Sequence, residues 1–143
     1  MIRGGYAIVI GSDWIPDHSR VEAGSEFWVV GTVVDGFAPN VDILNEPASG
    51  MTLDAYRASS IQGASQIVAQ FDVLESGVTT GTFAQPIGFV RFSGSIGGPV
   101  LNFLSVFILD ADRAILATFT APPGSFDTLL PEVEPFLMTL RSP

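Results

Sequence analysis

The sequence predicts a single α+β domain, spanning residues 1–143, that is built on a mostly antiparallel β-sheet flanked by helices. Its strand-like segments occur in groups instead of alternating with helices, which is typical of this class. Their order is β-β-β-α-β-β-β-β-α. No linker or internal repeat divides the chain, and 143 residues are enough for one hydrophobic core.

Three strands are expected before the first helix. They cover residues 6–10, 27–34 and 40–46. The first two are rich in apolar, largely β-branched side chains, and each of the three is followed by a turn-forming residue. The third strand alternates, so Val41 and Ile43 face one side of the sheet. Asp42 and Leu44 face the other side.

One helix is expected over residues 52–68. Thr52 is a suitable N-cap, and Asp54 in the first turn complements the helix dipole. Apolar and small residues recur at three- and four-residue steps, which is typical of a helix face that approaches a sheet closely. These residues are Leu53, Tyr56, Ser60, Ala64 and Ile67.

Further strand-like segments follow this helix. They cover residues 70–76, 78–83, 87–95, 100–109 and 114–120. The Ser76-Gly77 pair between the first two segments is a hairpin or bend signal. Residues 110–113 form a turn signal, which predicts that the last two segments pair as an antiparallel hairpin.

The C-terminal segment predicts a helix that its prolines interrupt. An apolar stripe runs from Leu129 to Leu140, but proline is comfortable only in the first turn of a helix. We therefore expect a short turn at residues 126–130, a helix that starts near Pro131, and strain or a kink near Pro135.

Charge and composition exclude several classes of function. The net charge is −9, and the six basic residues are dispersed arginines, so neither nucleic acid nor an anionic membrane surface is an expected partner. The absence of cysteine excludes disulfides, thiolate nucleophiles and cysteine-bound metals. Apolar runs reach about ten residues, short of the roughly 20 that span a bilayer. As written, the sequence predicts a cytoplasmic protein; an exported or lipoprotein form that has lost its signal would have the same sequence.

No catalytic residue, cofactor or metal is predicted. His18 is the single histidine, and it is expected to lie solvated in a polar loop beside Asp17. Asp110 and Asp112 resemble a carboxylate pair, but in a hairpin turn they cap backbone amides. A hydrolase would require polar groups to converge on one of these two places, and it is the least favoured class.

Two further sets of residues have alternative interpretations. Asn40, Asn45 and Glu46 either line a pocket or close turns, and we favour turns. The strand at residues 100–109 is apolar on both faces, so a second layer is expected to cover it. That layer is the domain's own helix, a second copy of the protein, or a guest apolar segment. The candidate binding residues are Phe103, Phe107, Leu109 and, from an earlier strand, Phe89.

Four local motifs, taken in order, resemble the LpqN-type lipoprotein family of actinobacteria. They are Trp14-Ile15-Pro16, Pro39-Asn40-Val41, the segment from Thr52 to Tyr56, and the ending that runs from Thr120-Ala-Pro-Pro to Leu140-Arg141. The resemblance implies a PsbP-like fold, an α/β/α sandwich around an antiparallel sheet. That family carries a signal peptide and an acylated cysteine, and this sequence contains neither, so lipoprotein status does not carry over.

The resemblance implies a non-catalytic role. Members of this fold mostly act as binding or assembly proteins, and a similar fold serves chaperones that shelter hydrophobic segments. We therefore expect a protein-interaction or chaperone/adaptor-like domain that uses an apolar sheet face or groove and binds a protein partner or itself as a homodimer. The alternative is a protein that binds a hydrophobic small molecule or lipid between the sheet and the helices.

Overall fold

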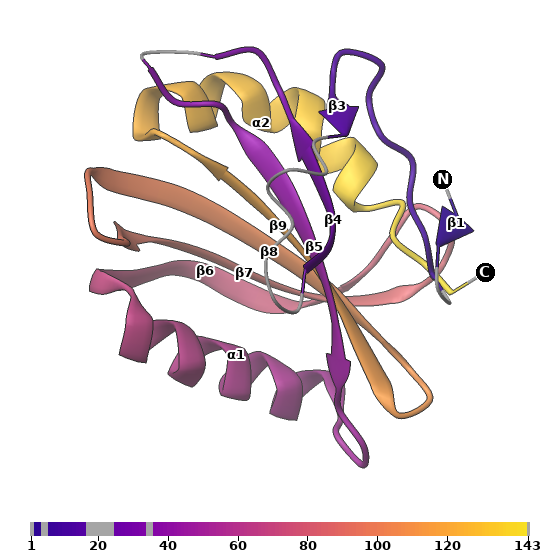
Figure 1. Cartoon of the computed structure of the whole chain (residues 1–143). Helices are drawn as coiled ribbons and strands as arrows, with labels where there is room; N and C mark the ends of the chain where they lie inside the picture. Colours follow the sequence, from indigo (N-terminus) through magenta and orange to yellow (C-terminus); the bar gives the residue numbers. More distant parts are fainter. Residues whose placement is uncertain (1, 4–5, 17–24, 34–35, 143) are drawn as a thin grey trace.

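A computed structural model describes the chain except for residues 1, 4–5, 17–24, 34–35 and 143 (Figure 1). In chain order the elements are β1 (Ile2–Arg3), β2 (Tyr6–Ala7), β3 (Ile15–Pro16), β4 (Ser25–Val30), β5 (Asn40–Pro47), α1 (Leu53–Ile67), β6 (Ala69–Thr80), β7 (Pro86–Ser95), β8 (Val100–Asp110), β9 (Arg113–Ala121) and α2 (Pro123–Leu137).

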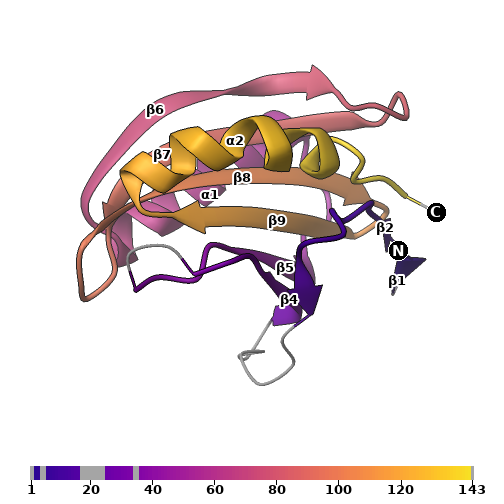
Figure 2. The same cartoon turned by 90° about the horizontal axis from the view of Figure 1, so that it is seen from above.

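The centre of the molecule is a seven-stranded antiparallel sheet with the strand order β3-β4-β5-β9-β8-β7-β6. The short strands β1 and β2 pair separately. Helices α1 and α2 lie on opposite faces of the large sheet (Figures 1 and 2). The predicted α+β sandwich is therefore confirmed, as is the grouping of four strands between the two helices.

The face under α2 holds the larger of two apolar clusters. Phe126 of α2 stacks on Phe119 of β9, with ring centroids 4.9 Å apart. Trp14 contacts the same Phe119 edge-on, at 6.1 Å. Val41 and Ile43 of β5 are fully buried here, on the side that their alternation predicts. This cluster anchors the N-terminal part of the chain, the middle of the sheet and α2 to one another.

The face under α1 holds a smaller, aromatic-rich cluster. Tyr56 of α1 lies over Phe107 of β8, with ring centroids 4.9 Å apart. Phe92 of β7 stacks on Phe103 of β8 at 4.6 Å. The apolar character of β8 on both faces follows from this arrangement, because each face contributes to a different cluster.

Helix α1 has the predicted start and end. The Thr52 hydroxyl accepts a hydrogen bond from the Ala55 backbone N–H at 3.1 Å, so Thr52 is the N-cap. The helix ends at Ile67, and the extended Val68 is its C-cap. The side chain of Val68 is buried, which fixes this end of the helix on the sheet.

The prediction of a bend at Ser76-Gly77 is wrong. Strand β6 continues through these two residues as one strand, with register irregularities near its start. A Cβ on Gly77 would lie 3.3 Å from the Phe89 ring of the neighbouring strand. The missing side chain leaves room for that ring, so this glycine serves strand packing and not a turn.

The prediction of an interrupted C-terminal helix is also wrong. α2 is a single helix that contains both Pro131 and Pro135. Each interior proline removes a backbone hydrogen bond at a cost of about 3 kcal/mol. Burial of an apolar stripe along the whole helix offsets this cost, because each fully buried large side chain contributes about 1.5–3 kcal/mol. The stripe consists of Phe126, Val133, Phe136 and Leu137.

Two of the strands expected in the N-terminal part have different bounds in the structure. The strand expected at residues 6–10 stops at Ala7, because the Val9 N–H donates to the Thr139 hydroxyl at 2.7 Å instead of to a strand. The strand expected at residues 27–34 runs from Ser25 to Val30. By contrast, the hairpin of β8 and β9 is confirmed, with Asp110 paired to Arg113 across a two-residue turn.

Candidate functional site: a groove between helix α1 and the sheet

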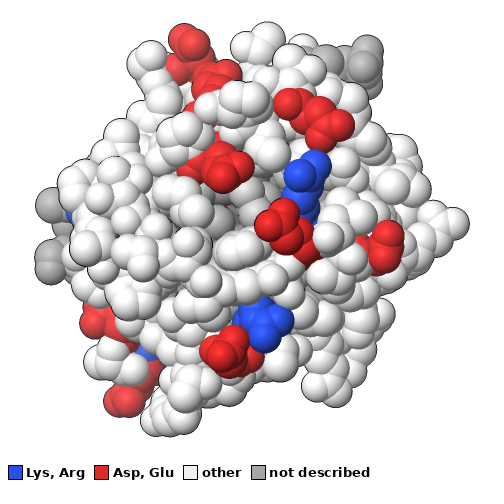
Figure 3. All heavy atoms as spheres, turned by 180° about the vertical axis from the view of Figure 1, so that it is seen from behind, with Lys and Arg blue, Asp and Glu red and all other residues white. Residues whose placement is uncertain are grey.

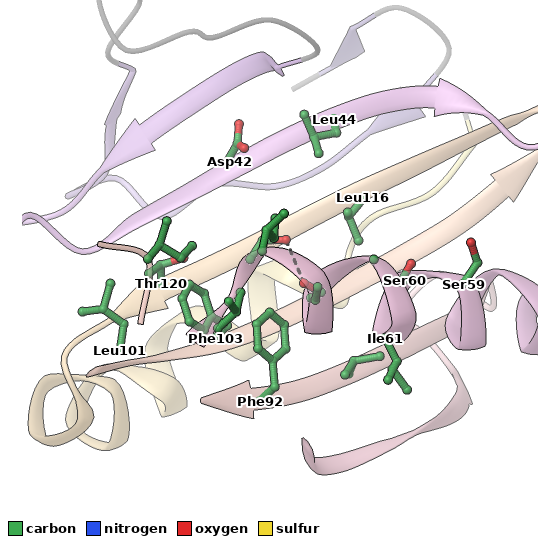
Figure 4. Close-up of a pocket in the computed structure, with 18 of the residues that line it drawn as sticks. Asp42, Leu44, Ser59, Ser60, Ile61, Phe92, Leu101, Phe103, Leu116 and Thr120 are labelled. Atoms are coloured by element: carbon green, nitrogen blue, oxygen red, sulfur yellow. Dashed lines mark hydrogen bonds between the residues drawn. The ribbon is translucent and has the colours of Figure 1, made fainter. Parts of the chain in front are cut away.

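A groove of about 710 Å³ runs between α1 and the central strands of the sheet. Figure 4 shows its two sides: Asp42 and Leu44 come from β5, and Ser59, Ser60 and Ile61 come from α1. Side chains from β7, β8 and β9 lie between them. The groove is mostly apolar, and its polar side chains come from β5, α1, β8 and β9.

The groove exists because α1 packs mainly on the outer strands β6 and β7. Val68 fills a hollow over Gly94 of β7, where an added Cβ would lie 2.1 Å from the valine side chain. Arg57 of α1 donates to the Ser76 hydroxyl of β6 at 3.0 Å. These contacts hold the helix to one side of the sheet, so that parts of β5, β9 and β8 face open space.

The floor of the groove combines aromatic and hydroxyl groups. The stacked pair of Phe92 and Phe103 forms its apolar part. On the neighbouring strands, the hydroxyls of Ser105 and Thr118 hydrogen-bond to each other at 2.8 Å. Leu116 of β9 lies between α1 and β5 (Figure 4). An occupant therefore meets a hydrophobic surface with a small polar strip in its middle.

Strand β5 forms the polar wall. Asn40, Asp42, Leu44 and Glu46 lie on the groove side of the strand, two residues apart. Asn40 is 5% exposed, and its amide nitrogen donates to the Ala38 carbonyl at 3.2 Å. Three of these four side chains carry oxygen atoms that can accept hydrogen bonds from an occupant.

One end of the groove is closed by a contact between the helix and the polar wall. The Tyr56 hydroxyl donates a hydrogen bond to the Glu46 carboxylate. Burial raises the pKa of Tyr56 well above its usual range, and the hydrogen bond to Glu46 and the negative charge of Glu46 raise it further. The tyrosine therefore stays neutral and remains a donor at physiological pH.

The groove is elongated. From Asn40 to Glu46, the β5 wall is about 20 Å long at the rise of an extended strand. The residues of α1 and its C-cap that line it, from Tyr56 to Val68, span about 18 Å at the rise of a helix. The apolar side chains of Ile67 and Ile96 lie at the end away from Tyr56 and are 73% and 58% exposed.

The charge of the lining is acidic. Asp42 and Glu46 are its charged residues, and none of the described residues that line the groove is lysine or arginine. Figure 3 shows a face of the molecule that is largely uncharged, with scattered acidic side chains and few basic ones. The local charge of the groove thus agrees with the net charge of −9.

The four candidate binding residues do not form one site. Phe103 lines the groove, whereas Phe107 is fully buried beneath Tyr56. Leu109 lies partly buried in the same cluster. Phe89 lies on the opposite face, packed against the larger cluster beside a small pocket of about 110 Å³. Their binding role stays a prediction, and the geometry supports it best for Phe103.

The groove also includes residues that sequence reasoning assigned to turns. Asn40 both bonds a nearby carbonyl and lines the groove, and Glu46 lines the groove and binds Tyr56. Asn45 instead accepts a hydrogen bond from the Arg113 side chain at 2.8 Å. The signal was present in the alternation of β5, which places Asp42 and Leu44 on this face.

Of the positions considered for catalysis, the structure describes Asp110 and Asp112. His18 and Asp17 lie outside the described residues. Asp110 ends β8, and Asp112 lies in the β8–β9 turn, where it accepts hydrogen bonds from the loop after β5. In the part of the chain that the structure describes, no three histidine, cysteine or acidic side chains gather as a metal site.

Comparisons with known proteins agree on the fold. No protein-family model and no curated protein matches the sequence. Among solved structures, cyanobacterial PsbP (CyanoP) from Synechocystis sp. PCC 6803 is 14% identical, with a TM-score of 0.69 over 97% of this chain and 87% of that one. LpqN of Mycobacterium tuberculosis, involved in cell envelope biogenesis, is 13% identical, with a TM-score of 0.66 over 96% and 83%.

A third similar structure is a protein of unknown function from Pseudomonas aeruginosa. It is 14% identical, with a TM-score of 0.72 over 98% of this chain and 99% of that one. Neither helix of the described residues has the length and apolar composition to cross a membrane. The likeness to these structures over nearly the whole chain shows that the protein has the PsbP-like fold.

Proposed function

We propose that this is a non-catalytic binding protein that holds an apolar segment of another protein in the groove between α1 and the sheet. The observation that carries the proposal is the 710 Å³ groove with its aromatic floor. Ligand sites in proteins are typically concave, mostly apolar and about 300–1,000 Å³ in size. The exposed side chains of Ile67 and Ile96 extend this apolar surface at one end.

The shape of the groove favours an extended protein segment. A length of about 20 Å accommodates about six residues of extended chain. Such a segment directs alternate side chains to opposite sides, so that one set meets Phe92 and Phe103. The other set and the backbone meet hydroxyl and carboxylate groups from β5 and β9. A purely hydrocarbon ligand would make no hydrogen bonds with this polar wall.

The comparisons support a binding role at a coarse level. The solved structures with this fold include PsbP and LpqN, and the order of motifs in this sequence resembles the LpqN-type family. This supports a relationship with that family and a role without catalysis. The second candidate function is the binding of a hydrophobic small molecule, which the volume of the groove favours.

A blocking substitution in the groove tests the proposal. Gly63 lines the groove, and nothing lies within 4 Å of a Cβ placed on it, so Gly63→Trp fills the groove without a clash near the backbone. Gln66→Trp is the matched control, because Gln66 is exposed on the same helix and does not line the groove.

The probe is a fluorescent, capped decapeptide with leucine at alternate positions and neutral polar residues between them. We expect its fluorescence anisotropy to rise with the wild-type protein and with Gln66→Trp, and at least tenfold weaker binding to Gly63→Trp. No binding to the wild type, or equal binding to Gly63→Trp, contradicts the proposal. If the apolar dye N-phenyl-1-naphthylamine binds in the groove and the peptide does not, the small-molecule function replaces it.

A second copy of the chain is the remaining occupant to distinguish. Light scattering behind size exclusion, run over a dilution series, measures the mass in solution. A wild-type dimer that Gly63→Trp converts to a monomer would place a second copy in the groove and make self-association the function. A monomer in both proteins leaves the groove open to the peptide.

A further inference from the structure

We propose that the segment held in the groove is the N-terminal end of a protein chain, with its α-amino group at the closed end of the groove beside Glu46. This inference rests on the proposed function, because it specifies which part of a partner the groove holds. A groove that is closed at one end accepts a chain end directly. An internal segment has to turn out of the groove before it reaches the closed end.

The closed end of the groove is built by consecutive parts of the chain. Strand β5 ends at Pro47, residues 48–52 form a short loop, and α1 begins at Leu53. The two sides of the groove therefore diverge from the loop that joins them (Figure 1). This loop is held in place, because the Ala48 backbone N–H donates to the Asp112 carbonyl at 2.8 Å.

Apolar side chains fill the space between the loop and the sheet. Ala48 and Ala114 are buried in the smaller cluster together with the ring of Tyr56, and Met51 packs against this cluster. The Tyr56 hydroxyl then links the helix to the Glu46 carboxylate on the other side of the groove. An extended chain that follows the floor toward this end meets close packing, and a chain terminus can stop there.

The opposite end of the groove is open. Ile67 at the end of α1 and Ile96 in the β7–β8 loop line the groove there, and both side chains are exposed. At about 3.3 Å per residue, a chain that begins beside Glu46 crosses the groove in about six residues. The rest of the partner therefore leaves over the apolar surface of Ile67 and Ile96.

Charge complementarity selects the amino end over the carboxyl end. Glu46 is exposed and lines the groove. Its hydrogen bond with Tyr56 does not use the full capacity of the carboxylate, which accepts bonds at both oxygens, and an α-ammonium group brings three N–H donors. An α-carboxylate in the same place meets like charge. None of the described residues that line the groove is a lysine or arginine that could bind it.

The dipole of α1 acts in the opposite direction but is weaker. The helix begins at the closed end, and the N-terminus of a helix carries about half a positive charge, which attracts anions. Asp54 in the first turn already supplies a carboxylate there, and the Thr52 hydroxyl occupies the Ala55 N–H at 3.1 Å. The charge of Glu46 is therefore expected to dominate at the end of the groove.

Unlabelled versions of the decapeptide test the inference by competing with the labelled, capped form. One has a free amino end and an amidated carboxyl end, one is acetylated and amidated, and one is acetylated with a free carboxylate. Measured by the loss of anisotropy at low salt, the free-amine peptide is expected to bind about three- to fivefold more tightly than the acetylated, amidated peptide. The free-carboxylate peptide is expected to bind more weakly than both.

Extended peptides test the requirement for a chain end. A short glycine-serine extension before the amino end is expected to weaken binding at least tenfold relative to the free-amine peptide, since the added residues have to turn out of the groove at Tyr56. The same extension after the carboxyl end is the matched control. It should bind within about twofold of the free-amine peptide, because this end leaves the groove over Ile67 and Ile96.

A charge-neutral variant assigns the preference to Glu46. Glu46→Gln retains a side-chain oxygen for the Tyr56 hydroxyl, and we expect the free-amine and acetylated peptides to bind to it within about twofold of each other. Glu134→Gln is the control, because it makes the same change at an exposed position on α2, on the other face of the sheet. The extended peptides need only the wild-type protein, so they test the inference even where circular dichroism shows that Glu46→Gln does not fold.

The outcomes separate this inference from the proposed function. If the capped decapeptide binds in the groove but the free amine adds nothing, or the extension before the amino end is tolerated, the inference is wrong and the binding function stands. If the free-carboxylate peptide binds most tightly, the groove holds a carboxyl end and the inference is also wrong. A preference for the free amine that persists in Glu46→Gln places its recognition elsewhere and overturns the inference. If no version binds, both proposals are overturned.

Discussion

The hydroxyl of Tyr56 on helix α1 donates a hydrogen bond to the carboxylate of Glu46 on strand β5, across one end of the groove. The same tyrosine ring lies over Phe107 in the smaller apolar cluster. One residue thus joins the helix to the polar wall and to the core beneath it. The contacts between α1 and β6 do not join the helix to the polar wall.

Removal of this hydroxyl is expected to lower stability modestly. Tyr56→Phe keeps the ring over Phe107 and deletes one hydrogen bond, which is typically worth about 1 kcal/mol. We expect the free energy of unfolding from urea titration at pH 7 to fall by about that amount, with an unchanged m-value. An unchanged stability would mean that the hydroxyl bonds equally well to water.

Alkaline pH should weaken the wild type more than the Tyr56→Phe variant. The folded protein raises the pKa of Tyr56 above the ordinary value of 10.0, so the tyrosine ionises more readily in the unfolded chain. Its contribution is present below about pH 10 and is lost at higher pH, at about 1.4 kcal/mol per unit. Urea unfolding at pH 9 and pH 11 should show the stability difference between the two proteins shrinking.

Replacement of Gly63 by alanine is expected to stabilise the protein. Gly63 lies inside α1, and nothing lies within 4 Å of an added Cβ. Alanine is favoured over glycine in a helix interior by up to about 1 kcal/mol. Thermal unfolding of Gly63→Ala should therefore give a higher midpoint. A lower midpoint would indicate that α1 approaches another part of the protein at this position.

Replacement of Gly88 by alanine should have the opposite effect. A Cβ on Gly88 would lie 2.2 Å from the ring of Phe107, which is fully buried and cannot move away freely. Overpacking of this kind typically costs about 1–3 kcal/mol. Gly98→Ala is the control, because nothing lies within 4 Å of a Cβ there. Equal stability of the two variants would contradict the packing described for Phe107.

Two phenylalanines should separate binding from structure. Phe103 lines the groove, whereas Phe89 lies on the opposite face of the sheet. We expect Phe103→Leu to weaken binding of the neutral decapeptide several-fold, and Phe89→Leu to leave it within about twofold. Both variants should lose some stability in urea titration. A larger binding loss in Phe89→Leu would move the site to the α2 face.

Local sequence signals predicted the elements whose boundaries depend on neighbouring residues. The Thr52 cap, the alternation of Val41 and Asp42 in β5, and the turn between β8 and β9 are all of this kind. The predictions failed where a distant partner decides the outcome. Gly77 was interpreted as a bend, but it accommodates the Phe89 ring, which belongs to another strand.

The same distinction explains what was missed in the groove. The alternation of β5 predicted that Asp42 and Leu44 share a face. It did not predict what that face meets, because the groove depends on where α1 docks. Docking over β6 and β7 is determined by contacts such as Val68 over Gly94, which lie outside β5 and are not visible in any local pattern. In α2, by contrast, the local signal is visible, because Pro131 and Pro135 disfavour a helix interior. Burial of the apolar stripe along the helix outweighs it.

The unequal division of the core between the two faces has an evolutionary consequence. The larger cluster lies under α2, while the open groove lies on the α1 face. Substitutions along the groove can therefore change its lining while the contacts of the larger cluster are kept. Structures only 13–14% identical to this chain still retain its architecture.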